Sequence, residues 1–244
     1  YLYSFGGGKA EGRADMKQLL GGKGANLAEM TNLGVPVPPG LTITTEACRT
    51  FYALGERWPE GLDAELKQAM AWLESITRKG FGTPANPLLV SVRSGAAISM
   101  PGMMDTILNL GLNTRTVQGL IEKTENPRFA YDAYRRFIQM YGNVVLGVEH
   151  RVFEDRLSAK KATYGATSDA ELRAEALKEL VGEYKQVIKQ AKGIEFPEEV
   201  MEQLRGAVNA VFSSWNNERA NIYRRLNNIP HSLGTAVTIQ SMVF

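Results

Sequence analysis

The spacing of hydrophobic and polar residues predicts several short strands. Residues 1–5 alternate as a strand does, and residues 41–44 form a second run after a proline-rich stretch. The strongest signal lies at residues 87–93, which are apolar enough for a central position in a sheet. Residues 106–111 then predict a returning strand, and residues 235–244 predict a last one.

Helical periodicity occupies most of the remaining chain. Thr45 is a natural N-cap for a helix that reaches about residue 54, and apolar residues recur at helical intervals over residues 62–73. From about residue 113 to residue 197 the pattern is almost wholly helical, and residues 201–215 give a further helix. We therefore predict an α+β fold with an inserted helical subdomain. The predicted subdomains are residues 1–112 (mixed α/β), 113–198 (mainly helical) and 199–244.

Composition and charge are those of an ordinary globular protein. Of the 244 residues, 44% are hydrophobic and 22% are charged, and the formal net charge is only +2. This balance disfavours nucleic acid as a partner. No apolar run approaches the roughly 18 residues of a membrane span, so no membrane association is expected. Cys48 is the single cysteine, which predicts a reducing, cytoplasmic compartment. Because residue 1 is not methionine and residue 244 lies in a strand-like run, we expect a longer protein.

The first candidate for chemistry is the sequence Gly-Gly-Lys-Gly at residues 21–24. Glycine lets backbone N–H groups turn toward a ligand, and the helix that follows contributes partial positive charge at its N-terminus. Lys23, with Gly22 and Gly24 beside it, therefore predicts phosphate binding. The turn is not a Walker A loop, because no Ser or Thr follows the lysine. A glycine-rich turn with a solvated lysine explains the same residues equally well.

The second candidate is Arg93, at the end of the strongest predicted strand. Open α/β sheets place ligands where strands end in loops. The guanidinium group of arginine can also contact phosphate oxygens through two N–H groups at once. An exposed arginine in an ordinary ion pair is the commoner explanation for any single arginine.

The loop at residues 94–105 has no charged residue before Asp105 and contains three methionines. Small residues, among them Gly102, let the backbone approach a ligand closely, and methionine adapts to an apolar surface. These features predict a lid over a nucleotide. Burial of the loop against a neighbouring subdomain is an equal alternative.

Residues 128–137 interleave basic and aromatic side chains. Asp132 lies three and four residues before Arg135 and Arg136, so pairing on one helix accounts for much of this pattern. We therefore predict a solvated helix face here. Neither His150 nor His231 has a nearby arrangement that suggests a nucleophile. The chemistry that the residues themselves indicate is binding.

Long stretches make the chain similar to the N-terminal part of the pyruvate phosphate dikinase family. The stretches are residues 20–30 (LGGKGANLAEM), 89–96 (LVSVRSGA), 100–112 (MPGMMDTILNLGL), 126–132, 135–141, 214–217 and 223–225. The fit is looser between about residues 152 and 200. This resemblance implies an ATP-grasp nucleotide-binding domain, incomplete here, in which residues 199–244 begin the second ATP-grasp subdomain.

The resemblance also implies an activity. Members of the family are phosphotransferases that interconvert ATP, phosphate and pyruvate with AMP, pyrophosphate and phosphoenolpyruvate. It implies Mg²⁺ and a monovalent cation as cofactors, a phosphohistidine carried by the protein's own central domain, and a full-length homodimer. The Mg²⁺ ligands and the carrier histidine are expected beyond Phe244, so residues 1–244 should lack a complete active site.

The resemblance assigns individual roles as well. It places the phosphate-contacting lysine at Lys23, the phosphate-clamping arginine at Arg93, and the backbone that reads adenine at residues 240–243. The full set of predicted ATP-binding residues is Gly22, Lys23, Gly24, Arg93, Gly102, Gln240, Met242 and Val243.

Two alternatives stay open. Phosphoenolpyruvate synthases share the Gly-Gly-Lys-Gly-Ala-Asn turn, but they usually carry an acidic segment after Val-Arg-Ser, where this chain continues without charge through residues 95–104. A non-catalytic nucleotide-sensing or docking module could keep the same fold. Such a module would lack the downstream carboxylates and the carrier histidine.

Overall fold

A computed structural model describes residues 1–244, which fall into two compact units. Unit 1 comprises residues 1–79, 90–106 and 208–244, and unit 2 comprises residues 80–89 and 107–207. The subdomain boundaries drawn from the sequence stay a prediction. The sheet of unit 1 nevertheless joins the first and the third predicted subdomain, because its last strand pairs with two strands from the first.

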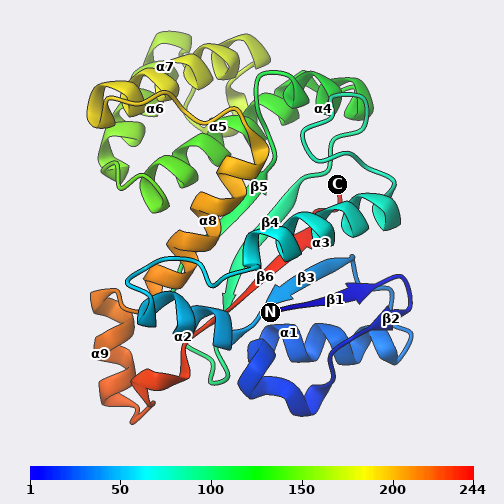
Figure 1. The fold of residues 1–244 in the computed structure, drawn as a ribbon. Helices are drawn as coiled ribbons and strands as arrows, with labels where there is room; N and C mark the ends of the chain where they lie inside the picture. The colour runs from blue at the N-terminus through cyan, green and yellow to red at the C-terminus, as the bar shows by residue number, and fades with distance from the viewer. The chain divides into compact units, whose positions relative to one another are not determined.

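The strands of unit 1 follow the order β2-β1-β3-β6-β4, and the neighbouring strands are antiparallel (Figure 1). Their bounds are β1 Leu2–Gly6, β2 Lys9–Ala10, β3 Gly40–Ile43, β4 Val90–Gly95 and β6 Ala236–Ser241. These strands confirm the strands expected from the sequence, but their ends differ and the short strand β2 was not expected. β4 begins at Val90 rather than at residue 87 and extends to Gly95. β6 stops at Ser241, so Met242–Phe244 lie outside the strand that we expected to include them.

The helices of unit 1 are α1 Lys17–Asn32, α2 Thr45–Ala53, α3 Leu62–Thr77 and α9 Glu218–Leu226, with short 3₁₀ turns at Ala14–Met16 and His231–Leu233. The expected N-cap of α2 is wrong by one residue. Thr44 is the cap, because its hydroxyl accepts the N–H of Ala47 at 3.3 Å. The Thr45 hydroxyl instead donates to the carbonyl of Gln18 at 2.7 Å.

The two faces of this sheet differ in polarity. One face carries buried apolar side chains, including Leu41, Val92 and Ile239. The other face carries Thr42, Thr238 and Arg93, which lie opposite one another on β3, β6 and β4. Helix α1 covers this polar face, because Gly24 packs against Thr42 (Figure 1). The site residues on α1 therefore lie above the polar side of the sheet.

Unit 2 is mainly helical. Its helices are α4 Thr116–Thr124, α5 Pro127–Val144, α6 His150–Tyr164 and α7 Ala174–Lys192, with a 3₁₀ turn at Asp169–Glu171. Strand β5, Thr106–Leu110, and helix α8, Val200–Ser214, each have residues in both units. Helix α5 begins after Asn126, whose side chain accepts the N–H of Phe129 at 3.0 Å. The helical character expected for residues 113–197 is thus present.

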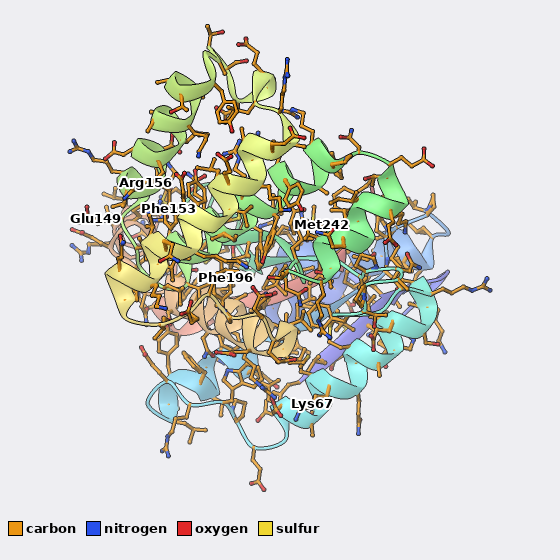
Figure 2. All side chains as sticks on the ribbon, turned by 90° about the horizontal axis from the view of Figure 1, so that it is seen from above. Lys67, Glu149, Phe153, Arg156, Phe196 and Met242 are labelled. Atoms are coloured by element: carbon orange, nitrogen blue, oxygen red, sulfur yellow. The ribbon has the colours of Figure 1, made fainter.

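Aromatic side chains form much of the core of unit 2. The rings of Phe137 and Tyr141 both meet that of Phe196 edge-on, with centroids 5.6 Å away in each case. Phe153 turns inward from α6 against Tyr184, whereas Arg156, one turn along the same helix, is exposed (Figure 2). The amphipathic pattern of the sequence therefore gives the correct inner face for these helices.

The solvated face predicted for residues 128–137 is wrong in one respect. Arg135 and Arg136 both pair with Asp132, as expected from their spacing. However, the Arg135 side chain is only 3% exposed and forms a second ion pair with Asp169, at 2.8 Å. Asp169 is 34 residues away along the chain, so the spacing rule for one helix could not reveal it.

Candidate functional site

Lys23 owes its position to a break in α1 at Gly21. Gly21 has φ 67° and ψ 169°, a backbone conformation that only glycine adopts easily. A Cβ atom at Gly21 would lie 1.7 Å from the carbonyl oxygen of Gly95, so no other residue fits there. The helix resumes at once, and Lys23 lies in its first turn. The expected arrangement of glycine turn, lysine and helix start is therefore present, although a helical turn also precedes it.

Gly22 and Gly24, two of the three glycines predicted to bind ATP, have structural contacts. The N–H of Gly22 donates to the carbonyl of Ala96 at 2.9 Å. A Cβ atom at Gly24 would lie 2.8 Å from the side chain of Thr42, so glycine lets α1 pack closely on β3. Gly21, which the sequence did not single out as a site residue, has the strictest requirement of the three. In the sequence, Gly21 appears only as one more glycine in the turn.

The ammonium group of Lys23 is held by a neutral oxygen. Its Nζ donates to the carbonyl of Ser94 at 2.7 Å, at the end of β4. Burial of this group and, second, the nearby charge of Arg93 lower the pKa of Lys23. The side chain as a whole still has an exposed surface. Lys23 is therefore a partly desolvated cation with no carboxylate to balance it.

Arg93 is held in the same way. Its Nη2 donates to the amide oxygen of Gln240 at 2.5 Å, and the Gln240 amide nitrogen donates to the carbonyl of Pro38 at 3.0 Å. The Nε atom of Arg93 is buried and has no hydrogen-bond partner. No ion pair joins Arg93 to an acid, so the common explanation of a surface ion pair does not describe this arginine.

Unpartnered polar atoms continue from Arg93 across the sheet. Thr238 lies opposite Arg93 on β6, and Thr42 lies opposite Thr238 on β3. Both hydroxyl oxygens are buried without a hydrogen-bond partner. A buried hydroxyl with no partner costs roughly 1–3 kcal/mol, so such a row is unusual in a native core. Functional sites are where proteins keep such local violations.

A cavity of about 570 Å³ opens beside Lys23. This volume is within the range of small-molecule sites, roughly 300–1,000 Å³. Its walls come from α1 and from the loop after β4. The lining includes Lys17, Gly22, Lys23, Asn26, Ser94–Ala97, Ser99–Gly102, Met104 and Thr106. Gly22, Lys23 and Gly102 thus meet in one cavity. Arg93, Gln240, Met242 and Val243 do not line it.

The residues predicted to read adenine have different surroundings. The side chain of Gln240 is occupied by Arg93 and Pro38, as described above. The carbonyl of Met242 accepts from Lys79 Nζ at 3.5 Å, just beyond the end of β6 (Figure 2). Val243 is 72% exposed. A role for their backbone in binding adenine stays a prediction.

The loop at residues 94–105, which we call the Met loop, is partly buried inside unit 1. Met100 and Ala96 pack in one cluster with Trp215, Ala220 and Ile229. The tip around Gly102 is exposed; Gly102 has φ 72° and no neighbour near its Cβ position. The middle of the loop is therefore buried and its tip is exposed, and a role as a lid over a nucleotide stays a prediction. Trp215, which the sequence did not indicate as a site residue, packs in the same cluster as this loop.

Residues 1–244 contain no group of three or more His, Cys, Asp or Glu side chains arranged to hold a metal ion. No helix combines the length and the apolar character required to cross a lipid bilayer.

Comparison with known proteins gives consistent matches. The family model described as "Pyruvate phosphate dikinase, AMP/ATP-binding domain" matches residues 17–71 and 54–244. A pyruvate, phosphate dikinase of Clostridium symbiosum is 56% identical over 245 residues, and that of Rhizobium meliloti (strain 1021) is 53% identical over 244 residues. A chloroplastic pyruvate, phosphate dikinase of Flaveria trinervia is 54% identical over 243 residues. All three matches cover 100% of this chain but only 25–28% of the relative.

Proposed function

The chain belongs to the pyruvate phosphate dikinase AMP/ATP-binding domain family, and we propose that it supplies the phosphate-binding part of an ATP-grasp domain in a full-length dikinase. The antiparallel sheet with helices fits this assignment at the level of an α+β fold. The ATP-grasp type and the insertion of residues 113–198 as a helical subdomain belong to the proposal.

The observation that carries the proposal is the pair of uncompensated cations. The Lys23 ammonium group on α1 is partly desolvated and donates to Ser94 of β4, Arg93 lies within β4 with its Nε atom buried, and both side chains donate only to neutral oxygens. A partly desolvated cation without a carboxylate carries an energetic cost, and an anion that pairs with it lowers that cost. The phosphates of ATP are such an anion, and charge-assisted hydrogen bonds to phosphate are strong.

The proposed reaction converts ATP, phosphate and pyruvate to AMP, pyrophosphate and phosphoenolpyruvate. In this scheme Lys23 and Arg93 bind the ATP phosphates and stabilise the negative charge that develops on their oxygens during transfer. Gly22, Gly24 and Gly102 let the backbone of α1 and the Met loop approach the phosphates. Gln240 orients Arg93, and the backbone of Met242 and Val243 contacts adenine.

The wider assignments are also proposals. The phosphoryl group would pass to a histidine on the protein's own central domain, phosphate would be a second substrate, and the full-length protein would be a cytoplasmic homodimer. Mg²⁺ and a monovalent cation would assist. Residues 1–244 contain no group of three or more His, Cys, Asp or Glu side chains that could hold the ion.

The test uses the full-length protein and its two half-reactions. Lys23→Met and Arg93→Leu should each slow the ATP half-reaction by roughly 10²–10³-fold, the cost of removing one donor from a developing charge. The pyruvate half-reaction should keep its rate. Lys67→Met is the matched control, because Lys67 is exposed on α3 and pairs only with the neighbouring Asp63 (Figure 2).

Equal losses in both half-reactions, or unfolding of either variant, would contradict the proposed roles. Isothermal titration of Mg-ATP into the same proteins separates binding from chemistry. Normal turnover with normal ATP affinity in Lys23→Met would remove the role assigned to Lys23, whereas absence of the ATP half-reaction from the parent protein would favour the non-catalytic docking module.

A further inference from the structure

The Met loop is tied to unit 1 at both of its ends. At its start, the carbonyls of Ser94 and Ala96 accept from Lys23 Nζ at 2.7 Å and from the N–H of Gly22 at 2.9 Å. At its end, the carbonyl of Met103 accepts from Asn217 Nδ2 at 3.0 Å. The first tie belongs to the phosphate site. The second tie holds Met103, which stands between the cavity-lining residues Gly102 and Met104, so it fixes the part of the loop that borders the cavity.

The second tie rests on the corner between α8 and α9, residues 214–217. Ser214 Oγ accepts the N–H of Asp105 at 3.4 Å. The Trp215 side chain is 1% exposed and packs against Met100 of the loop. Its indole N–H donates to the carbonyl of His231 at 2.9 Å. The corner therefore contacts the loop through two hydrogen bonds and one apolar anchor.

Arg224 stabilises this corner through stacking and hydrogen bonds. Its guanidinium carbon lies 3.9 Å from the centre of the Trp215 ring, and its Nη1 donates to the Trp215 carbonyl. Further bonds run to His231 Nδ1 at 3.0 Å and to Asn221 Oδ1 at 2.6 Å. Arg224 is completely buried, so these bonds fix the corner rather than reach a ligand. A rigid corner can hold a loop in one place.

Asn217 connects the corner to the loop by using both halves of its amide. Its Oδ1 accepts the N–H of Ala220 at 2.7 Å and so caps the start of α9. Its Nδ2 is the donor to Met103. A carboxylate would keep the cap but lack the donor, and a serine would keep a cap but not reach the loop. The two contacts can therefore be separated by substitution.

We propose that Asn217 is a positioning residue for the phosphate site. It does not touch the ligand; it holds the Met103 carbonyl and thereby keeps the Met loop over the cavity. The loop is fixed at Met100 by Trp215 and at Met103 by Asn217. Between these anchors lies Gly102, whose positive φ and open surroundings let the tip adjust to a bound nucleotide. This inference rests on the proposed function of Lys23 and Arg93.

The experiment compares three variants of the full-length protein. Asn217→Ser keeps a capping hydroxyl and loses the bond to Met103, whereas Asn217→Ala loses both. Asn126→Ser is the matched control, because Asn126 caps α5 in unit 2 and its side chain contacts no loop carbonyl. Amide hydrogen exchange without nucleotide reports on residues 97–105 and on α9. The KM for ATP and the kcat of the ATP half-reaction report on function.

For Asn217→Ser we expect faster exchange in the Met loop, unchanged exchange in α9, and a KM for ATP about three- to tenfold higher, the effect of one hydrogen bond. The pyruvate half-reaction should not change. Asn217→Ala should add faster exchange in α9. Asn126→Ser should alter none of these quantities.

Unchanged exchange in the Met loop of Asn217→Ser would overturn the tie itself. Faster loop exchange with normal ATP kinetics would overturn the positioning role, provided that Lys23→Met still removes the ATP half-reaction. If Lys23→Met leaves that half-reaction intact, the proposed function fails, and the positioning role fails with it. The exchange data thus distinguish failure of the contact from failure of the site.

Discussion

Both units hold cationic side chains that are at least partly removed from solvent, but the two units balance these charges differently. In unit 2, Arg135 donates to Asp132 and to Asp169, each at 2.8 Å. In unit 1, Lys23 and Arg93 donate only to neutral oxygens. The charge of Arg135 is therefore compensated within its own unit. The charges of Lys23 and Arg93 are not.

The pKa shifts of Arg135 and Lys23 differ in the same way. Burial alone would lower the pKa of Arg135, but the carboxylates of Asp132 and Asp169 outweigh it and raise the pKa. For Lys23, burial and the charge of Arg93 act in the same direction and lower the pKa. Unit 2 thus uses its charges for its own stability. Unit 1 keeps a positive potential that suits an anionic ligand, at some cost in stability.

The largest expected effect on stability is therefore in unit 2. Arg135→Met leaves two partly buried carboxylates without their partner and should lower the free energy of unfolding by about 3 kcal/mol. Asp132 and Asp169 are 17% and 33% exposed, which keeps the effect near the lower end of the usual range. Urea denaturation followed by circular dichroism measures this change. Lys23→Met, which removes an uncompensated charge, should leave the free energy of unfolding unchanged or higher.

Arg136→Met is the control for this prediction. Arg136 pairs with the same Asp132, but its side chain is 56% exposed, so we expect a loss of no more than about 0.5 kcal/mol. If Lys23→Met lowered the free energy of unfolding as much as Arg135→Met does, the proposed difference in charge compensation between the two units would be wrong.

The pH dependence of stability sharpens the same contrast. Burial would raise the pKa of Asp169, but hydrogen bonds from Lys161 and Arg135 outweigh it and hold the pKa below its usual value. Such a carboxylate contributes stability above its unfolded-state pKa, about 4, and the contribution is lost as pH falls through the lower folded-state pKa. Asp169→Asn should therefore be less stable than the parent protein by about 1 kcal/mol at pH 7.

The two proteins should converge as the pH is lowered below about 4, because the parent then loses the contribution that Asp169→Asn never had. Thermal unfolding of both proteins between pH 7 and pH 3 tests this. A difference that stays constant over that range would show that packing, not charge, accounts for the loss.

Local patterns were sufficient for most of the fold. Alternation and helical periodicity placed the strands and the helical region, since each depends on neighbours a few residues apart. The end of β6 was missed because Met242–Phe244 continue its apolar character without pairing. The second partner of Arg135 was missed because Asp169 approaches from a distant turn. Contacts between segments far apart in the sequence have no periodicity to reveal them.

In the candidate site, too, contacts between distant segments could not be predicted from the sequence. The residue types of Lys23 and Arg93, and the place of Lys23 beside a glycine turn, were visible in the sequence. The strand-end position expected for Arg93 was wrong, because β4 continues to Gly95. The strict need for glycine at Gly21 was not visible, because it depends on the carbonyl of Gly95. The role of Trp215 also could not be seen, because it packs on a loop more than a hundred residues earlier.

The smallest expected effect concerns two buried threonines. Thr116 in unit 2 is fully partnered: its hydroxyl donates to the Gly111 carbonyl and accepts the N–H of Asn113, both at 2.8 Å. Thr238 in unit 1 has no partner. Thr116→Val should therefore cost roughly 1–2 kcal/mol in unfolding free energy, whereas Thr238→Val should be neutral or stabilising by up to about 1 kcal/mol.

Thr238→Val replaces the hydroxyl at nearly constant shape, whereas Thr238→Ser keeps the hydroxyl and loses the methyl group, so the pair separates the two contributions. Urea denaturation of the three variants and of the parent protein gives the free energy of unfolding of each. A clear loss of stability in Thr238→Val alone would mean that its hydroxyl has a partner, such as an ordered water molecule. A gain in stability together with slower ATP turnover would show that unit 1 keeps this unpartnered hydroxyl beside Arg93 for function, whereas unit 2 uses its hydroxyl to hold the fold.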